Sequence, residues 1–248
     1  MNARIDRLWP DPAADLDDER ILAEYTPRSS SWTRFNFVES LDGAATHEGR
    51  SGGLGGDGDR RVFELMRRWA DVVLVGAGTI RAEGYGAMRF DDEVAAWRRA
   101  RGIAPQPTMA IVSGRLDLDP ASAVFTEASV RPVVFTLSTA PADRRAALAE
   151  VADVRDAGDD VLDPRRVLTD LESLGLRKVH AEGGPTLFGS FVAAGVLNEL
   201  CLTLAPRLEA GRAGRIATSA PAEPLGMRLA GILRSGDDEL LLRYLRVT

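Results

Sequence analysis

Apolar residues recur along the chain with two different periods, and the segments that show them alternate. Phe35 and Phe37 lie two positions apart within Thr33–Glu39, which indicates a strand with one apolar face. In Asp57–Ala70 the apolar side chains recur instead at intervals of three and four residues, as on one face of a helix. Asp71–Val75 is a short β-branched run, which is typical of a strand buried on both faces.

The same alternation continues to the end of the chain. Pro141 and Pro164 stand where two further helices are predicted to begin, a position that suits proline. The further predicted helices are Asp91–Arg101, Ala140–Val151, Asp163–Leu174 and Thr186–Ala194, and the further predicted strands are Thr108–Val112, Pro132–Thr136, Lys178–Ala181, Asn198–Ala205, Leu225–Leu233 and Glu239–Val247.

Strands that alternate with helices predict an α/β fold of three layers, in which helices cover a mostly parallel central sheet. The last two strands have no helix between them, so we expect an antiparallel C-terminal edge. No repeat or linker divides the chain, and residues 32–248 are predicted to form a single domain. Residues 1–31 are predicted to form an N-terminal extension with a short helix at Asp15–Tyr25. It packs on the body or on a second subunit, or lies as a surface arm.

Composition narrows the class of protein. Of the 248 residues, 45% are apolar and 27% are charged, values typical of a globular chain rather than a disordered one. The net charge of −6 argues against nucleic-acid or anionic-membrane binding. No apolar run is long enough for a membrane span, and the first residues lack the apolar region of a signal peptide. We therefore expect a cytoplasmic protein.

Rare residue types restrict the chemistry further. Cys201 is the only cysteine, which excludes an internal disulfide and any zinc site that needs two thiolates, so no metal is expected. Lys178 is the only lysine, so a phosphate group must be held by arginine, backbone N–H groups or hydroxyls. The two histidines, His47 and His180, are interpreted as structural residues.

Glycine-rich segments follow two of the predicted strands, where ligands bind in open α/β sheets. Gly76-Ala77-Gly78-Thr79 follows Asp71–Val75, and its backbone can approach a phosphate or nucleotide closely. Spacing alone leaves a plain tight turn equally open. Gly183-Gly184-Pro185-Thr186 begins a helix whose first N–H groups favour an anion. Glu182 adds an ionisable group that a turn does not explain, and this favours a functional site.

Two further segments and three arginines are weaker candidates. Ser51–Gly58 contains five glycines and is either a mobile lid or a flexible loop, and its composition favours the loop. Ser40–Gly43 suits an ordinary turn. Arg67 and Arg89 are candidates to meet an anionic substrate, whereas Arg81 is predicted to be a surface residue.

Three ordered segments, FNFVESLDGAAT, LMRRWADVVLVGAGTIRAEG and HAEGGPTLFGSFVAAGVLNELCLTLAP, resemble the reductase domain of the riboflavin-biosynthesis deaminase/reductase family. The resemblance covers roughly residues 33–210. It implies a dihydrofolate-reductase-like fold, a homodimer and NADPH as cofactor. The implied reaction reduces the ribosyl group of 5-amino-6-(5-phosphoribosylamino)uracil to ribityl. Hydride passes from C4 of the nicotinamide to C1′ of the opened sugar.

The resemblance also implies roles for individual residues, although it identifies no catalytic one. Glu182 is implied to contact the pyrimidine or ribose, and the arginines the phosphate. The implied cofactor-binding residues are Gly76, Ala77, Gly78, Thr79, Glu83, Gly183, Gly184, Pro185, Thr186, Leu187, Phe188, Gly189 and Ser190, and the implied substrate-binding residues are Ser51, Arg67, Ala87, Arg89 and Glu182.

The chain departs from the family pattern in its substrate segments. Ala44 stands where a basic residue is common, Glu83-Gly84-Tyr85 replaces Asp-Asp-Pro, and Gly53–Gly56 replaces a tryptophan-containing stretch. The zinc signature of the deaminase domain needs several cysteines, so we do not expect that domain within these residues. These departures leave two alternatives open. One is a reductase of a different pterin or pyrimidine, such as dihydrofolate. The other is an NADPH-binding sensor without turnover.

Overall fold

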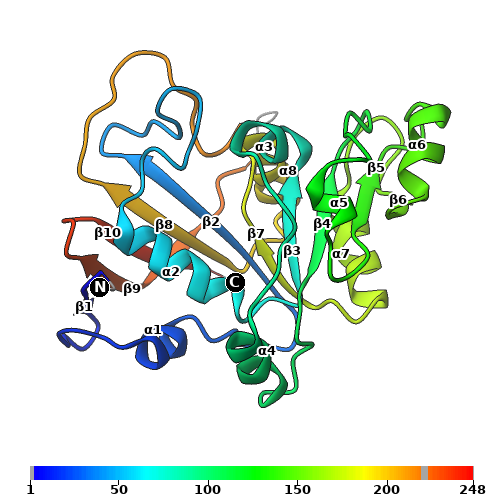
Figure 1. Ribbon diagram of the computed structural model, residues 1–248. Coiled ribbons are helices and arrows are strands. Elements are labelled where there is room, and N and C mark those ends of the chain that lie inside the picture. The colour runs from blue at the N-terminus through cyan, green and yellow to red at the C-terminus, as the bar shows by residue number, and fades with distance from the viewer. Residues whose placement is uncertain (1–2, 219–222, 248) are drawn as a thin grey trace.

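The computed structural model describes residues 3–218 and 223–247, and ten strands of these residues form one sheet (Figure 1). The order across the sheet is β1-β9-β10-β8-β2-β7-β3-β4-β5-β6. The strands are β1 (Ile5–Trp9), β2 (Trp32–Ser40), β3 (Val72–Gly76), β4 (Thr108–Val112), β5 (Val133–Thr136), β6 (Asp153–Asp156), β7 (Lys178–Ala181), β8 (Glu199–Ala205), β9 (Met227–Ser235) and β10 (Leu240–Arg246). The helices are α1 (Asp18–Glu24), α2 (Asp57–Arg67), α3 (Ala77–Glu83), α4 (Asp92–Arg99), α5 (Ala123–Thr126), α6 (Ala142–Ala149), α7 (Pro164–Ser173) and α8 (Pro185–Ala194).

The strands from β8 to β6 run parallel, whereas β10, β9 and β1 add an antiparallel edge. The predicted α/β class, with a mostly parallel sheet and an antiparallel C-terminal edge, is therefore confirmed. The long connections that contain helices permit parallel pairing, whereas only a short turn joins β9 to β10, so these two strands pair antiparallel.

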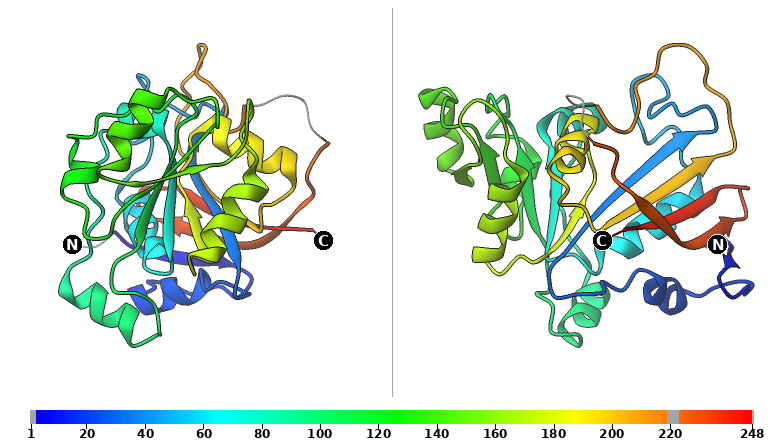
Figure 2. Two further views of the ribbon diagram at one scale, coloured as in Figure 1. Left: turned by 90° about the vertical axis from the view of Figure 1, so that its right-hand side faces the viewer. Right: turned by 180° about the vertical axis from the view of Figure 1, so that it is seen from behind.

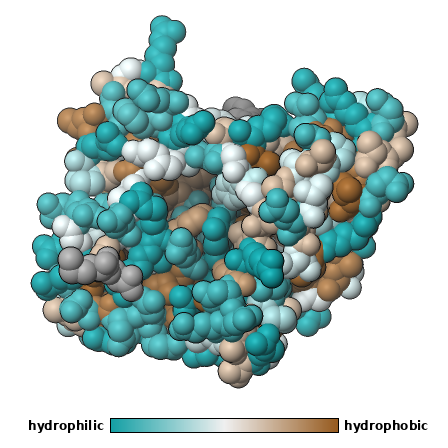
Figure 3. All heavy atoms as spheres, in the orientation of Figure 1, coloured by the Kyte–Doolittle hydropathy of each residue, from teal (hydrophilic) through white to brown (hydrophobic). Residues whose placement is uncertain are grey.

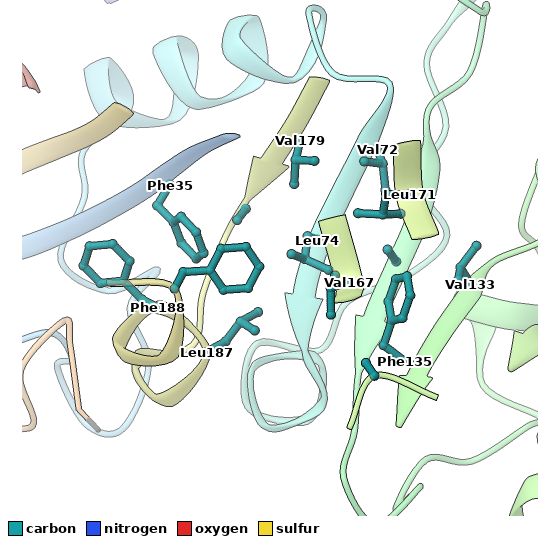
Figure 4. Close-up of a cluster of buried hydrophobic side chains, with 14 of the residues drawn as sticks. Phe35, Val72, Leu74, Val133, Phe135, Val167, Leu171, Val179, Leu187 and Phe188 are labelled. Atoms are coloured by element: carbon teal, nitrogen blue, oxygen red, sulfur yellow. The ribbon is translucent and has the colours of Figure 1, made fainter. Parts of the chain in front are cut away.

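Alternate residues of the central strands face different helices, which gives the fold its three layers. In β3, Val72 and Leu74 pack against α7 and α8, as Figure 4 shows for one buried cluster. Val73 and Val75 pack on the opposite face with α3, α5 and α6. A third apolar cluster joins α1 and α2 to β8, β9 and β10. The two-sided burial of β3 explains why its sequence is a continuous apolar run.

The N-terminal segment adds to the sheet rather than lying apart from it. Its first strand, β1, pairs antiparallel with β9, an element that the sequence pattern did not predict. Helix α1 contacts α2, where Arg61 forms an ion pair with Asp18, and just beyond the end of α2 the indole of Trp69 donates to the carbonyl of Leu22. The division into an extension over residues 1–31 and one domain over 32–248 stays a prediction.

Helix α2 begins without a side-chain cap of its own. Its N-cap is Gly56, and the Glu239 carboxylate, from the β9–β10 turn, accepts the N–H groups of Gly56 and Asp59. A carboxylate at this end of a helix is also favoured by the helix dipole. The contact fixes the start of α2 relative to the antiparallel edge. Among the described residues, no helix combines the length and apolar character needed to cross a membrane.

Candidate active site

A cavity of about 1640 Å³ lies at the carboxyl ends of the parallel strands β2, β3 and β7. Figure 3 shows the molecule hollowed near the middle of this face. Cavities for a single small ligand commonly measure roughly 300–1,000 Å³, so this one has room for two ligands side by side. Its walls differ accordingly. One wall is glycine-rich backbone from the starts of α3 and α8, and the other carries polar side chains from α2, β2 and the segment after α3.

The two glycine segments cross at the base of the cavity. The N–H of Gly76 donates to the carbonyl of Gly183 over 2.7 Å. A Cβ on Gly76 would lie 3.3 Å from the backbone nitrogen of Gly184, closer than ordinary van der Waals contact. Gly183 has φ +89°, which side-chain-bearing residues rarely adopt, and a Cβ there would lie 3.0 Å from the ring of Phe37. The close approach of the two segments therefore requires glycine at these positions.

Helices begin directly after both glycine segments. Helix α3 starts at Ala77 and helix α8 at Pro185. The first intrahelical bond of α8 runs from the Phe188 N–H to the Gly184 carbonyl, which leaves the N–H groups of Thr186 and Leu187 without a helical acceptor. Such a helix start favours an anionic group such as a pyrophosphate.

The structure brings most, but not all, of the expected cofactor residues to the cavity. Gly183, Phe188 and Gly189 do not line it. Gly183 acts through its carbonyl. Phe188 packs behind the wall, with its ring centroid 4.9 Å from those of Phe35 and Phe37. Figure 4 shows Phe188 beside Phe35. The expected cofactor residues that line the cavity are Gly76, Ala77, Gly78, Thr79, Glu83, Gly184, Pro185, Thr186, Leu187 and Ser190, and the expected substrate residues that line it are Ser51, Arg67, Ala87, Arg89 and Glu182.

Glu182 is the centre of a buried hydrogen-bonding group at the polar wall. Arg67 donates from Nε to Oε1 over 2.6 Å and from Nη2 to Oε2 over 2.8 Å, and the Tyr85 hydroxyl donates to Oε2 over 2.7 Å. The Glu182 side chain is 1% exposed and that of Arg67 is 21% exposed. Burial alone would raise the pKa of Glu182, but the Arg67 charge and hydrogen bonds hold this pKa below its usual range. Glu182 is therefore a carboxylate at neutral pH.

The partners of Glu182 are themselves held in place. The guanidinium of Arg67 lies over the ring of Phe63, 4.1 Å from its centroid. Burial, and then the neighbouring Glu182 charge, raise the pKa of Tyr85, so its hydroxyl stays protonated. Because Arg67 is already paired with a carboxylate, its charge is largely balanced before any substrate arrives.

The two histidines lie outside the lining of the cavity. His180 is buried behind Glu182, with Nε2 3.6 Å from Oε1 of Glu182, and neither ring nitrogen has a hydrogen-bond partner among the described residues. Burial lowers the pKa of His180 to about 4, so the ring is neutral at pH 7. His47 pairs through Nδ1 with Glu209 over 2.7 Å. These contacts suit the structural role expected for both residues.

The glycine-rich segment after Ser51 is tied to the site by Glu83. Its Oε1 accepts the Ser51 N–H over 2.7 Å and the Ser51 hydroxyl over 2.9 Å. Glu83, one of the residues that replace the Asp-Asp-Pro common in the family, thus holds Ser51 at the edge of the cavity. Sequence reasoning missed further polar and aromatic lining residues, namely Asn36, Asp59, Phe63, Arg68 and Tyr85.

The mostly parallel sheet, with crossed glycine segments beside a polar wall at its carboxyl edge, defines an α/β domain that can bind ligands at that edge. Residues 31–241 match the RibD C-terminal domain family, and the chain belongs to that family. The resemblance read from the sequence is therefore confirmed. Among the described residues, no group of three or more histidine, cysteine, aspartate or glutamate side chains is arranged to hold a metal ion.

Individual relatives agree with this membership. The chain is 30% identical over 181 residues to the 2,5-diamino-6-ribosylamino-4(3H)-pyrimidinone 5′-phosphate reductase of Methanothermobacter thermautotrophicus, covering 73% of this chain and 80% of that protein. It is 26% identical over 178 residues to the reductase of the same name from Archaeoglobus fulgidus, covering 71% and 81%. A pyrimidine reductase-like protein from Corynebacterium diphtheriae shares the fold, with a TM-score of 0.84, 24% identity and coverage of 94% and 100%.

Proposed function

We propose that the protein is an NADPH-dependent reductase of a ribosylamino-pyrimidine 5′-phosphate in riboflavin biosynthesis. The observation that carries the proposal is the crossing of Gly76 with Gly183 and Gly184 directly beside Glu182. This crossing places glycine backbone that can bind a dinucleotide next to polar side chains that can bind a second ligand. The two archaeal relatives named above, reductases of such a phosphate, support this assignment.

NADPH fits the glycine-rich wall. A Cβ on Gly78 would meet no heavy atom within 4 Å, so the backbone of this segment borders open space, and the first N–H groups of α8 suit a pyrophosphate. NADPH would supply the hydride from C4 of its nicotinamide. The cofactor-binding role of the glycine segments, of Glu83 and of Pro185–Ser190 remains part of this proposal.

The chain's own residues then position the substrate and exclude water. Glu182 is ionised and accepts three hydrogen bonds from Arg67 and Tyr85, so it orients these two side chains rather than delivering a proton. The Arg67 charge is balanced by Glu182, whereas the described structure gives the exposed Arg89 side chain no carboxylate partner. Arg89 is therefore the better anchor for a phosphate, and Arg67 for the sugar or ring.

The antiparallel edge supports a homodimer, which we include in the proposal. Alternate residues of β8 and β10 pair across the strands and form a half-buried apolar face. In the right-hand view of Figure 2 these strands lie in front of α2, and no described helix covers them. A second copy would bury this face. Sedimentation of a Leu202→Glu variant should show monomers where the parent shows dimers; a monomeric parent would remove the claim. The paired residues are Leu200 with Tyr244, Leu202 with Leu242, and Leu204 with Leu240.

The cofactor claim is tested by NADPH binding to a Gly183→Ala variant. Strain at φ +89° and the approach to Phe37 should displace the glycine segment and weaken NADPH binding at least about tenfold. Gly214→Ala is a matched control, because a Cβ there would meet nothing within 4 Å. Unchanged affinity for NADPH in a folded Gly183→Ala protein would count against a cofactor site at the glycine segments. Turnover with each candidate substrate then separates the riboflavin reductase from the pterin reductase. NADPH binding without turnover would indicate the sensor.

A further inference from the structure

One face of helix α2 presents three chemically different side chains to the cavity. Asp59, Phe63 and Arg67 are spaced four residues apart, and all three line it. Arg67 belongs to the Glu182 group described above, and Phe63 supports Arg67. Asp59 takes part in neither contact.

Asp59 differs from the other acids at the cavity in its available acceptor capacity. Glu182 already accepts three hydrogen bonds from Arg67 and Tyr85, and Glu83 is bonded to Ser51. Arg60, beside Asp59 in the chain, pairs with Asp57 instead. No cationic nitrogen of the described residues lies within ion-pair distance of Asp59.

The Asp59 carboxylate is held in position without being neutralised. Its Oδ2 lies so close to Gly55 that a Cβ on that glycine would be 2.3 Å away. The Thr203 hydroxyl on β8 lies beside the carboxylate. Burial raises the pKa of Asp59 to about 6, and the neighbouring Thr203 hydroxyl opposes the rise. At neutral pH the group is mainly an oriented carboxylate with acceptor positions left for a ligand.

Asn36 provides a second, independent sign of a ligand at this wall. Asn36 is 8% exposed, and it lines the cavity from the middle of β2, between Phe35 and Phe37. None of the hydrogen bonds within the described residues uses its side-chain amide. Buried amides nearly always have partners, so this one is suited to bind a ligand.

The strand register brings Asn36 and Asp59 to the same part of the cavity. Asn36 pairs with Cys201 across β2 and β8, and Val38 pairs with Thr203. Asn36 and Thr203 are therefore diagonal neighbours on one face of the sheet. Since Thr203 lies beside Asp59, the carboxylate and the amide line neighbouring parts of the cavity between α2 and the sheet.

We propose that Asp59, with Asn36 beside it, recognises the 2-amino-4-oxopyrimidine edge of the substrate and thereby selects a 2-aminopyrimidinone over a uracil. This edge presents two adjacent donors, the ring N3–H and the 2-amino N–H, and a carboxylate accepts both. In a uracil the 2-amino group is replaced by a carbonyl, whose oxygen would face the carboxylate with no proton between them. Asn36 supplies an N–H donor for the 4-oxo group. The proposal rests on the proposed function and narrows its substrate.

The test compares two substrates that differ only at C2. These are 2,5-diamino-6-ribosylamino-4(3H)-pyrimidinone 5′-phosphate and 5-amino-6-ribosylaminouracil 5′-phosphate. The parent protein should favour the diamino compound in kcat/KM by about tenfold to a hundredfold, the range expected for one two-point hydrogen-bonded pair. In Asp59→Asn the new amide offers one donor and one acceptor, which match the N3–H and C2 carbonyl of the uracil. The preference should fall to near equality or reverse.

An increase in reduction of the uracil substrate by Asp59→Asn cannot arise from misfolding, so this increase is the decisive result. Asp57→Asn is the matched control, because it removes the same charge two residues away at a side chain that is 73% exposed. It should keep the parent's preference. A parent that prefers the uracil, or an unchanged preference in Asp59→Asn, would overturn the proposal while leaving the reductase function intact.

Binding of the free bases separates this proposal from the proposed function. If neither phosphate is reduced, the function fails, and calorimetry with 2,5,6-triamino-4-pyrimidinone against 5,6-diaminouracil still tests the edge. Tighter binding of the triamino base, lost in Asp59→Asn, would support the proposal, and equal binding would overturn it. Dihydrofolate carries the same edge. If the protein reduces dihydrofolate in an Asp59-dependent manner but reduces neither phosphate, Asp59 still recognises this edge, and the substrate is a pterin.

Discussion

The ion pair between Arg67 and Glu182 makes a quantitative prediction about stability. Glu182→Gln removes the charge that balances Arg67 but keeps the side-chain shape. Breaking a buried pair from one side typically costs about 3–5 kcal/mol, because the remaining charge stays buried without its partner. Arg67 is 21% exposed and can turn partly towards solvent in the cavity, so we expect the lower end, about 3 kcal/mol.

Urea unfolding measures this loss directly. With a slope of about 3 kcal/mol per molar urea, the midpoint should fall by about 1 M. Arg67→Met combined with Glu182→Gln should recover most of the loss, since the double variant leaves no uncompensated charge in the buried site. Arg67→Met alone leaves the Glu182 carboxylate buried, so its pKa should rise and its destabilisation should grow with pH.

An exposed pair serves as the control. Glu19 and Arg101 are 64% and 36% exposed, so Glu19→Gln should leave the midpoint nearly unchanged. A loss below about 1 kcal/mol in Glu182→Gln, or a double variant no more stable than that single variant, would refute the reasoning. Either result would mean that the two-point contact does not hold in solution.

Three further predictions concern single side chains near the site and in the core. Because burial lowers the pKa of His180 to about 4 from 6.5, its contribution to stability is complete above pH 6.5 and is lost as pH falls towards 4. The free energy of unfolding of the parent should therefore fall by about 3 kcal/mol more than that of His180→Leu over this window, and parallel curves would contradict this. Tyr85→Phe should lower stability by about 1.5 kcal/mol and raise KM for the substrate, because it deletes a hydrogen bond to a charged group; an unchanged Tm and KM would argue against the Tyr85 contact. Burial raises the pKa of the Cys201 thiol, so a thiol reagent should label it only at the rate of unfolding, and rapid labelling of the native protein would disagree.

Sequence reasoning recovered those elements whose burial leaves a clear period. The bounds of β4 and β7 were predicted at the residues where they lie: β4 is a short apolar run, and β7, KVHA, stands between a predicted helix and the glycine pair at Gly183. Strand β1 was missed because its sequence, IDRLW, mixes charged and apolar residues without a period. Strand β6, DVRD, is an edge strand whose side chains are half-buried or exposed, and so it carries no buried apolar face. Strands β1 and β6 form because they pair with a neighbouring strand, β9 or β5, and this pairing leaves no pattern in their own sequences.

The site could be predicted where the backbone geometry requires a particular residue type. Glycines after strands marked the segments that cross at Gly76 and Gly183, because only glycine fits there. The partner of Arg67 could not be predicted from spacing, since Glu182 lies 115 residues away and meets it only through tertiary packing. Asn36 and Asp59 were missed for the same reason. A single polar residue in a strand or helix has meaning only once the face it occupies is known.

The most direct test of the proposed activity is NADPH oxidation by the purified protein with 2,5-diamino-6-ribosylamino-4(3H)-pyrimidinone 5′-phosphate. We predict saturable oxidation that depends on the substrate and yields the ribityl product, one molecule for each NADPH consumed. Binding of NADPH without oxidation by this compound or by its uracil counterpart would contradict the proposed reductase.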